Sequence, residues 1–215
     1  MHIMDGILTP LWSITWFVIA LVFIIIGTRQ IMKKRKENPA FMSILALMGA
    51  AVFVISIWHI PVPVTGSCSH PCGTALSAIL VGPFVTAVIS SIALFFQMFL
   101  AHGGLTTLGA NTVSMGIVGG FTGYFAYLAL RKVGASFWFS AGVGGLLGDL
   151  MTYVTTALQL ALSLHQESVL SSWGIFTIGF IPTQIPLAII EFGFTAVAIQ
   201  YVVNRRPEML RWRKK

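Results

Sequence analysis

The first two residues of the chain, Met1 and His2, carry three nitrogen atoms that could bind one metal ion. The Met1 amine, the His2 backbone nitrogen and the His2 ring Nδ1 can close two adjacent chelate rings once the amine and the amide lose their protons. A fourth nitrogen would complete a square plane, which suits Ni(II) or Cu(II) and can accommodate Co(II). His70, in a segment flanked by Pro63 and Pro71, is the candidate for that ligand. Copper stands above nickel and cobalt in the affinity order, so geometry alone leaves it open.

The elements that must position these ligands are membrane helices. The chain has 215 residues, of which 56% are hydrophobic and 9% charged, and its mean hydropathy is +0.88. This composition excludes a soluble domain with a water-facing surface. The shorter apolar stretch 73–82 predicts a buried, broken or re-entrant helix. Longer apolar runs, each near the roughly 17–25 residues that span a bilayer, lie at 11–27, 40–60, 84–101, 111–130, 136–162 and 181–203.

The basic residues predict the topology. All 13 fall in three clusters, Arg29 to Lys36, Arg131 with Lys132, and Arg205 to Lys215, which the positive-inside rule places in the cytoplasm. Successive spans place all three clusters on the same side of the membrane only if 73–82 counts as a crossing. We therefore expect an all-α polytopic membrane protein, a single domain over 1–215 with about seven transmembrane helices, its N-terminus outside and its C-terminus inside. The net charge of +7 then reflects membrane topology and not nucleic-acid binding.

Two further observations concern the outer face. The basic cluster follows the first apolar run, the reverse of a secretory signal peptide, so we expect Met1 in the mature protein. Histidine is the commonest metal ligand, and every histidine falls on the predicted outer side, in a pattern independent of the basic residues that predict the topology. An outward-facing metal site follows. The five histidines are His2, His59, His70, His102 and His165.

Five sequence blocks resemble the substrate-specific M component of nickel and cobalt energy-coupling-factor (ECF) transporters, known as CbiM or NikM. The resemblance implies an ECF S-component-like helical fold with an extra N-terminal helix that inserts the N-terminus into an outward-facing pocket. It also implies ligation by the Met1 amine, the backbone nitrogen and ring of His2, and the ring of His70. The blocks are MHIMDGIL, VTGSCSHPCGTALSAILVGP (64–83), AHGGLTTLGANTVSMGI (101–117), GDLMTYVTTALQLAL (148–162) and TQIPLAIIE (183–191).

The resemblance further implies partners in the bacterial or archaeal cell (inner) membrane. These are a transmembrane coupling subunit, ATPase subunits and often a small accessory membrane subunit, in a system linked to cobalamin biosynthesis. The chain has no GxxxxGK[ST] phosphate loop, so ATP hydrolysis is expected in the partners. Ni2+ or Co2+ is the transported substrate, with no organic cofactor. Ala46 and Ala50 form a small-xxx-small pair that could dock the coupling subunit.

Other residues near these blocks have open roles. His102 and Asn111 could orient the metal ligands, or they could only stabilise loops by hydrogen bonds. Asp5 could hold the N-terminal segment in place. Cys68 and Cys72 bracket His70, and metal ligation, a disulfide or plain packing are all possible, with packing the default.

Two carboxyl groups, Asp149 and Glu191, lie within apolar spans, where a charge is costly. The spans contain no Lys or Arg to pair with them. They could be protonated, lie near an aqueous boundary, or form hydrogen bonds with Tyr153, Gln184 or Thr183.

Three other functions are compatible with a membrane protein of this composition. An intramembrane metalloprotease is disfavoured because HExxH is absent and four nitrogen ligands leave no place for a catalytic water. A vitamin-binding S component does not explain the clustered outer histidines. A stand-alone metal permease remains open. Between nickel and cobalt the sequence points both ways. Four nitrogens in a plane favour Ni(II), whereas the SCSHP block more closely resembles the cobalt branch of the family.

Overall fold

The computed structural model describes residues 2–58, 60–62, 67–100, 102–165, 168–207 and 209. Each apolar run expected from the sequence corresponds to a helical segment in these ranges, and a short hairpin follows the second one. The elements are α1 (Pro10–Glu37), α2 (Phe41–Ser56), β1 (Ile60–Val62), β2 (Ser67–Ser69), α3 (Thr74–Val81), α4 (Pro83–Gln97) with η1 (Met98–Leu100), α5 (Leu108–Asn111) continued by the π-helical η2 (Thr112–Gly119) and α6 (Gly120–Lys132), α7 (Phe137–Leu164) and α8 (Val169–Arg205).

The protein is an integral membrane protein. In the part of the chain that the structure describes, four helices are long and apolar enough to cross a membrane: Pro10–Glu37, Pro83–Leu100, Leu108–Lys132 and Val169–Arg205. The helix α3 has eight residues, a rise of about 12 Å, which is less than half of the roughly 30 Å hydrocarbon core. The count of seven crossings and the orientation of the termini therefore stay predictions.

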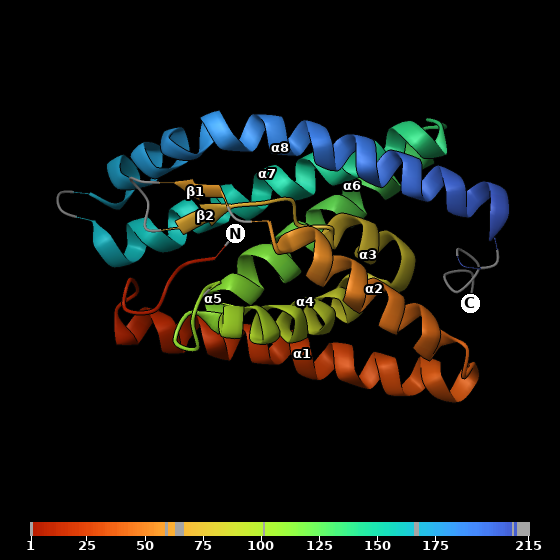
Figure 1. The fold of residues 1–215 in the computed structure, drawn as a ribbon, viewed down its shortest axis with the longest axis horizontal. Helices are drawn as coiled ribbons and strands as arrows, with labels where there is room; N and C mark the ends of the chain where they lie inside the picture. The colour runs from red at the N-terminus through yellow and green to blue at the C-terminus, as the bar shows by residue number, and fades with distance from the viewer. Residues whose placement is uncertain are drawn as a thin grey trace.

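The helices form an elongated bundle with chemically distinct ends. In Figure 1, α7 and α8 run side by side along one edge and α1 along the opposite edge, with α3 to α6 between them. The hairpin lies at one end of the bundle. The C-terminal ends of α1, α6 and α8, whose last turns carry basic residues, lie at the other end. The basic residues that end these three helices therefore share one end, as the topology prediction requires.

The buried helix α3 is held at both ends by side chains from other helices. At its N-terminus, the Glu191 carboxyl oxygens accept the backbone N–H groups of Cys72 (3.2 Å) and Gly73 (2.8 Å). At its C-terminus, the Lys34 ammonium donates to the Val81 carbonyl oxygen at 2.6 Å. An acidic group at the start and a cation at the end both complement the helix dipole. The segment that joins β2 to α3 is thereby fixed in position.

The turn from α3 into α4 depends on one glycine. Gly82 has φ +103°, a backbone conformation that residues with a Cβ rarely adopt. Pro83 then begins α4, where its fixed φ and missing N–H cost nothing. The chain can therefore end one helix and start the next without a loop.

The two carboxyl groups inside the helices both have polar partners. Asp149 accepts a hydrogen bond from Gln184 at 2.9 Å, which is one of the expected pairings. Glu191 instead accepts the two backbone amides before α3. The hydroxyls of Tyr153 and Thr183 bond to the segment that includes β2.

Candidate metal centre

The segment before α1 folds back and lies against the hairpin (Figure 1). Ile3 forms an antiparallel bridge with Ser67, and the Ser67 hydroxyl donates to the His2 carbonyl oxygen at 3.1 Å. On the other side, Asn111 Oδ1 accepts the Ile3 N–H at 2.9 Å and Asn111 Nδ2 donates to the Ile3 carbonyl oxygen at 3.2 Å. His2 is therefore held between β2 and the start of the α5–η2–α6 helix.

Asp5 ties this segment to the loop that precedes α5. Its carboxylate accepts the N–H of Leu105 (3.3 Å) and both the N–H (2.9 Å) and the hydroxyl (2.5 Å) of Thr106. The Thr106 hydroxyl is the main cause that lowers the pKa of Asp5, and partial burial opposes it. A Cβ on Gly104 would lie 2.0 Å from Asp5 Cγ, so glycine is needed for this approach. The geometry fits the anchoring role expected of Asp5.

The two candidate ligand rings meet inside the protein. The side chains of His2 and His70 are both 0% exposed, and His2 Nδ1 lies 3.0 Å from His70 Nε2. Two nitrogen ligands about 2.0–2.1 Å from one metal, at right angles, are about 2.9 Å apart. The two nitrogens thus have the spacing of neighbouring corners of a square plane.

The environment of His70 selects which ring nitrogen offers a lone pair. Its Nδ1 lies 2.9 Å from the Pro71 carbonyl oxygen, which can only accept, so Nδ1 carries the proton and Nε2 is the basic nitrogen. The Tyr153 hydroxyl accepts the His70 N–H at 2.9 Å and donates to the His70 carbonyl oxygen at 3.1 Å. Both the backbone and the tautomer of His70 are therefore fixed.

The ring of His2 is oriented by Gln97 on α4. His2 Nε2 lies 2.8 Å from Gln97 Oε1, while Gln97 Nε2 donates to the Phe53 carbonyl oxygen (3.0 Å) and to Ser56 Oγ (2.8 Å). Because these bonds fix the amide orientation, its oxygen must face His2 and accept the Nε2 proton. The lone pair of His2 is then on Nδ1. Two lone pairs 3.0 Å apart repel each other and attract a cation.

Cys68 is the third possible ligand at this place. One donor atom from each of His2, Cys68 and His70 lies within 4.8 Å of the others, and Cys68 Sγ is 3.5 Å from His2 Nδ1. Burial raises the pKa of the Cys68 thiol. Cys68 and Cys72 are both free, so the disulfide considered from the sequence is absent. The sulfur of Cys72 contacts the carbonyl oxygen of His70 at 4.0 Å.

Of the other candidate residues, His102 and Asn111 both lie next to His2. The His102 ring packs edge-on against the His2 ring, with centroids 5.5 Å apart, and its Nδ1 donates to the Leu100 carbonyl oxygen at 2.8 Å. Asn111 acts on the backbone next to His2, as described above. Met1 and His59 lie outside the described residues.

Sequence reasoning missed Gln97, which binds the His2 ring directly. Its only sequence signal is a single amide in the otherwise apolar run IALFFQMFL. A buried amide inside a span must find hydrogen-bond partners, but the sequence does not say which.

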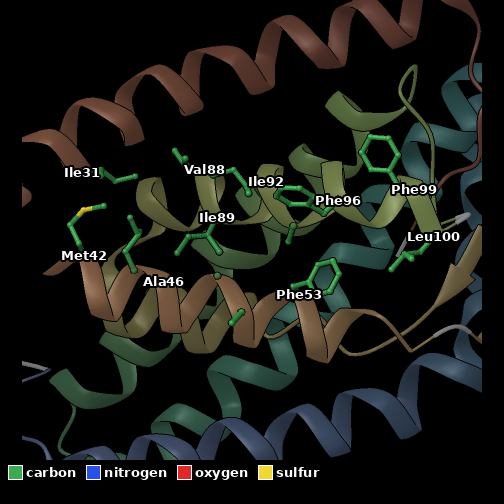
Figure 2. A pocket seen from close by; sticks show the side chains of 14 residues that line it. Ile31, Met42, Ala46, Phe53, Val88, Ile89, Ile92, Phe96, Phe99 and Leu100 are labelled. Carbon is green, nitrogen blue, oxygen red and sulfur yellow. The ribbon is translucent and has the colours of Figure 1, made fainter. Parts of the chain in front are cut away.

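Ala46 and Ala50, the predicted docking pair, lie on α2 at a separate surface. They line an apolar groove of about 620 Å³ together with residues that include Ile31 of α1 and Ile92 of α4. Figure 2 shows the groove running between α1, α2 and α4. Phe53, whose carbonyl oxygen holds Gln97, also lines it.

Comparison with known proteins gives a consistent result. Residues 2–209 match the family model described as CbiM, cobalt uptake substrate-specific transmembrane region. The chain is 44% identical over 212 residues to the cobalt transport protein CbiM of Sorangium cellulosum, covering 98% of this chain and 94% of the relative. It is also 44% identical over 212 residues to the protein of the same name from Geobacter sulfurreducens, covering 98% of this chain but 61% of that longer relative.

An archaeal relative and a crystal structure agree with these matches. The putative cobalt transport protein CbiM of Methanocaldococcus jannaschii is 44% identical over 211 residues, covering 98% of this chain and 90% of the relative. A crystal structure of a transition metal transporter superimposes with a TM-score of 0.81 at 23% identity, covering 99% of this chain and 97% of that one. At that identity the structural match supports the fold alone.

Proposed function

Because the chain belongs to the CbiM family of cobalt-uptake substrate-specific transmembrane proteins, we propose that it is the substrate-binding membrane subunit of an ATP-driven ECF-type importer for divalent nickel or cobalt. The ion is its transported substrate. The ATPase and transmembrane coupling subunits, with a small accessory membrane subunit where one exists, are separate chains. The proposed location is the bacterial or archaeal cell (inner) membrane, with the metal site toward the outside.

The approach of His2 Nδ1 to His70 Nε2 at 3.0 Å carries this proposal. Both nitrogens are the basic ones of their rings, because Gln97 and the Pro71 carbonyl oxygen take up the other two. The backbone nitrogen of His2 and the amine of Met1 are the proposed third and fourth ligands. Chelation by the Met1 amine and the His2 backbone nitrogen would complete the square plane in which the ring nitrogens of His2 and His70 are the other two ligands.

Loading of the ion requires movement of the covering segments. The His2 and His70 side chains are fully buried, so solvent does not reach their nitrogens in this conformation. The N-terminal segment is attached at Ile3 and Asp5 by hydrogen bonds to Asn111 and Thr106. We propose that this segment detaches to admit the ion and closes over it, so that His2 is both ligand and part of the cover.

Release to the inside would depend on the partner subunits. We propose that a transmembrane helix of the coupling subunit packs into the groove at Ala46 and Ala50. A Cβ added to the neighbouring Gly49 meets nothing within 4 Å, and small residues of this kind let membrane helices approach closely. Since α2 also holds Gln97 through Phe53 and Ser56, movement of α2 would disturb the orientation of His2.

The proposal is tested by metal titration of the purified full chain in detergent. We expect one Co(II) or Ni(II) per chain. Insertion of one alanine before Met1 should abolish tight binding, because the amine moves out of position; mass spectrometry must first show that Met1 is retained. His165→Ala is the matched control, since His165 bonds only to its own helix at Ala161 in the described contacts. Undiminished affinity in the extended variant would refute the amine ligand, and absence of stoichiometric binding would refute the function.

A further inference from the structure

We propose that the Cys68 sulfur is a direct ligand of the captured ion, so that the site has a mixed nitrogen–sulfur donor set suited to cobalt(II). This inference rests on the proposed function, because it concerns the same site. It adds a donor that a plane of four nitrogens does not contain.

The distances around His2 permit one metal ion to bind all three side chains. Cys68 Sγ lies 3.5 Å from His2 Nδ1. For a metal–nitrogen bond of about 2.0–2.1 Å and a metal–sulfur bond of about 2.3 Å, this separation corresponds to an N–metal–S angle of roughly 105–109°. The angle between the two histidine nitrogens, 3.0 Å apart, is close to a right angle by the same calculation. One ion can therefore contact all three donor atoms, which lie within 4.8 Å of one another. Because the four proposed nitrogen ligands already fill the plane, the sulfur is assigned the position above it.

The backbone of Cys68 is held on both sides. Ser67 bridges Ile3, and the Ser69 hydroxyl bonds the Thr183 hydroxyl at 2.8 Å. Cys68 itself pairs with a residue of β1 in the hairpin, and its side chain is buried. The sulfur is thus presented to the His2 ring by a fixed backbone. A cysteine that served only to fill space could face any apolar neighbour.

The chemistry of the step is simple. Because the contact of His2 Nε2 with Gln97 Oε1 leaves the lone pair of the ring on Nδ1, the thiol is the donor in its contact with Nδ1, and a metal would take the same lone pair. When the ion binds, the sulfur and Nδ1 both bond to the metal and the thiol proton leaves to solvent. No oxidant or reductant takes part.

An apical sulfur would distinguish the metals. A plane of nitrogens without a further ligand suits Ni(II) and Cu(II). Co(II) accepts a fifth ligand readily, so the sulfur adds more to its binding than to that of square-planar Ni(II). Cys68 would therefore shift the metal preference of the nitrogen site from Ni(II) toward Co(II).

The test uses the near-ultraviolet absorption of the full chain loaded with Co(II), in which a thiolate ligand produces a sulfur-to-cobalt charge-transfer band. The chain has two cysteines, so Cys72→Ser leaves Cys68 as its only thiol and Cys68→Ser leaves Cys72. The two side chains are both buried and free, which makes the variants a matched pair. We expect the band in the wild type and in Cys72→Ser, and no band in Cys68→Ser.

The affinities supply a second readout. Cys68→Ser should lower the Co(II) affinity by about 10- to 100-fold, the range seen when even a supporting contact of a metal site is lost, and should lower the Ni(II) affinity less. Equal losses for the two metals would overturn the preference for cobalt.

The outcomes separate this inference from the proposed function. Stoichiometric Co(II) binding by Cys72→Ser without the band would overturn Cys68 ligation and leave the proposed function intact. A band that persists in Cys68→Ser would overturn it as well. Failure of the wild type to bind Co(II) or Ni(II) would instead refute the proposed function. If Cys68→Ser does not fold, as judged by size-exclusion chromatography, the spectrum of Cys72→Ser decides the question.

Discussion

His2 Nδ1 and His70 Nε2 lie 3.0 Å apart although the two residues are separated by 68 positions in the chain. The pair exists only when the N-terminal segment has folded back onto the hairpin. One half of the candidate metal centre is therefore on a segment attached by hydrogen bonds, and the other half is in a loop fixed by Tyr153 and by the anchored helix α3. The candidate centre is thus assembled from two parts of the chain that different contacts hold in place.

Replacement of Gln97 should weaken metal binding without removing a ligand. Gln97→Met deletes the oxygen that accepts the His2 Nε2 proton, so the ring is free to protonate Nδ1 or to rotate. We expect a loss of about 10- to 100-fold in Co(II) or Ni(II) affinity, measured by competition with a chelating dye.

Gln159→Met is the matched control for Gln97→Met. Gln159 is also fully buried, but its amide donates to the Ala110 carbonyl oxygen. If both substitutions lower metal affinity equally, the loss reflects general destabilisation and Gln97 has no special role in orienting His2.

The attachment of the N-terminal segment should depend on pH through Asp5. The hydrogen bond from Thr106 lowers the pKa of Asp5 in the folded state, so ionised Asp5 stabilises the attachment at pH values above the ordinary carboxyl pKa of about 3.9. This contribution is lost as the pH falls through the lowered pKa. Hydrogen-exchange protection of the Leu105 and Thr106 amides should therefore fall on strong acidification.

Asp5→Asn should reduce that protection already at neutral pH and flatten its pH dependence. Asn38→Asp, at an exposed turn where the side chain accepts the Ala40 N–H, is a suitable control. Unchanged protection of both amides in Asp5→Asn would show that the carboxylate does not hold the segment.

The end of α3 offers a test of the fold. Lys34→Met removes the ammonium that donates to the Val81 carbonyl oxygen and should lower the free energy of unfolding by about 1–2 kcal/mol. Lys33→Met, one residue earlier and exposed, should change it by less than about 0.5 kcal/mol. Thermal unfolding in detergent measures both, and equal stability of the two variants would argue against the role of Lys34.

The apolar groove on α2 makes a prediction about transport. Ala50→Leu fills space that a partner helix would need, at a cost of about 1–3 kcal/mol for an overpacked contact. ATP-dependent uptake into vesicles that contain the whole transporter should fall about tenfold or more, while metal binding by the isolated chain stays unchanged. Ser43→Leu, exposed on the same helix and outside the groove, is the control. Normal uptake by Ala50→Leu would show that the coupling subunit does not dock in this groove.

Much of the fold follows from the sequence because hydrophobic length is a strong signal in a membrane protein. The length of the run 73–82 predicts that it differs from the others, and the structure contains there the eight-residue buried helix α3. Its capping by Lys34 and Glu191 could not be predicted, since these residues are remote in the chain and show no shared pattern. The π-helical turn of η2 also has no local signal in its composition.

The sequence predicts the pair His2 and His70, which the structure brings together, but not the residues that orient their rings. His2 and His70 were found from chelate chemistry and from sequence blocks that resemble a known family. Gln97 was not, because a lone amide in an apolar helix carries no motif, and its role arises only from the packing of α2 against α4. The sequence leaves packing as the default role of Cys68, and only the structure brings its sulfur within 3.5 Å of His2 Nδ1.

The most direct test of the account is the position of the bound ion. Crystals of the full chain grown with Co(II) would be measured at the cobalt absorption edge, and an anomalous difference map would locate the metal. We predict one strong peak per chain, about 2.0–2.1 Å from both His2 Nδ1 and His70 Nε2. A cobalt peak that is not bonded to both rings would contradict the central claim, that His2 and His70 bind the ion together.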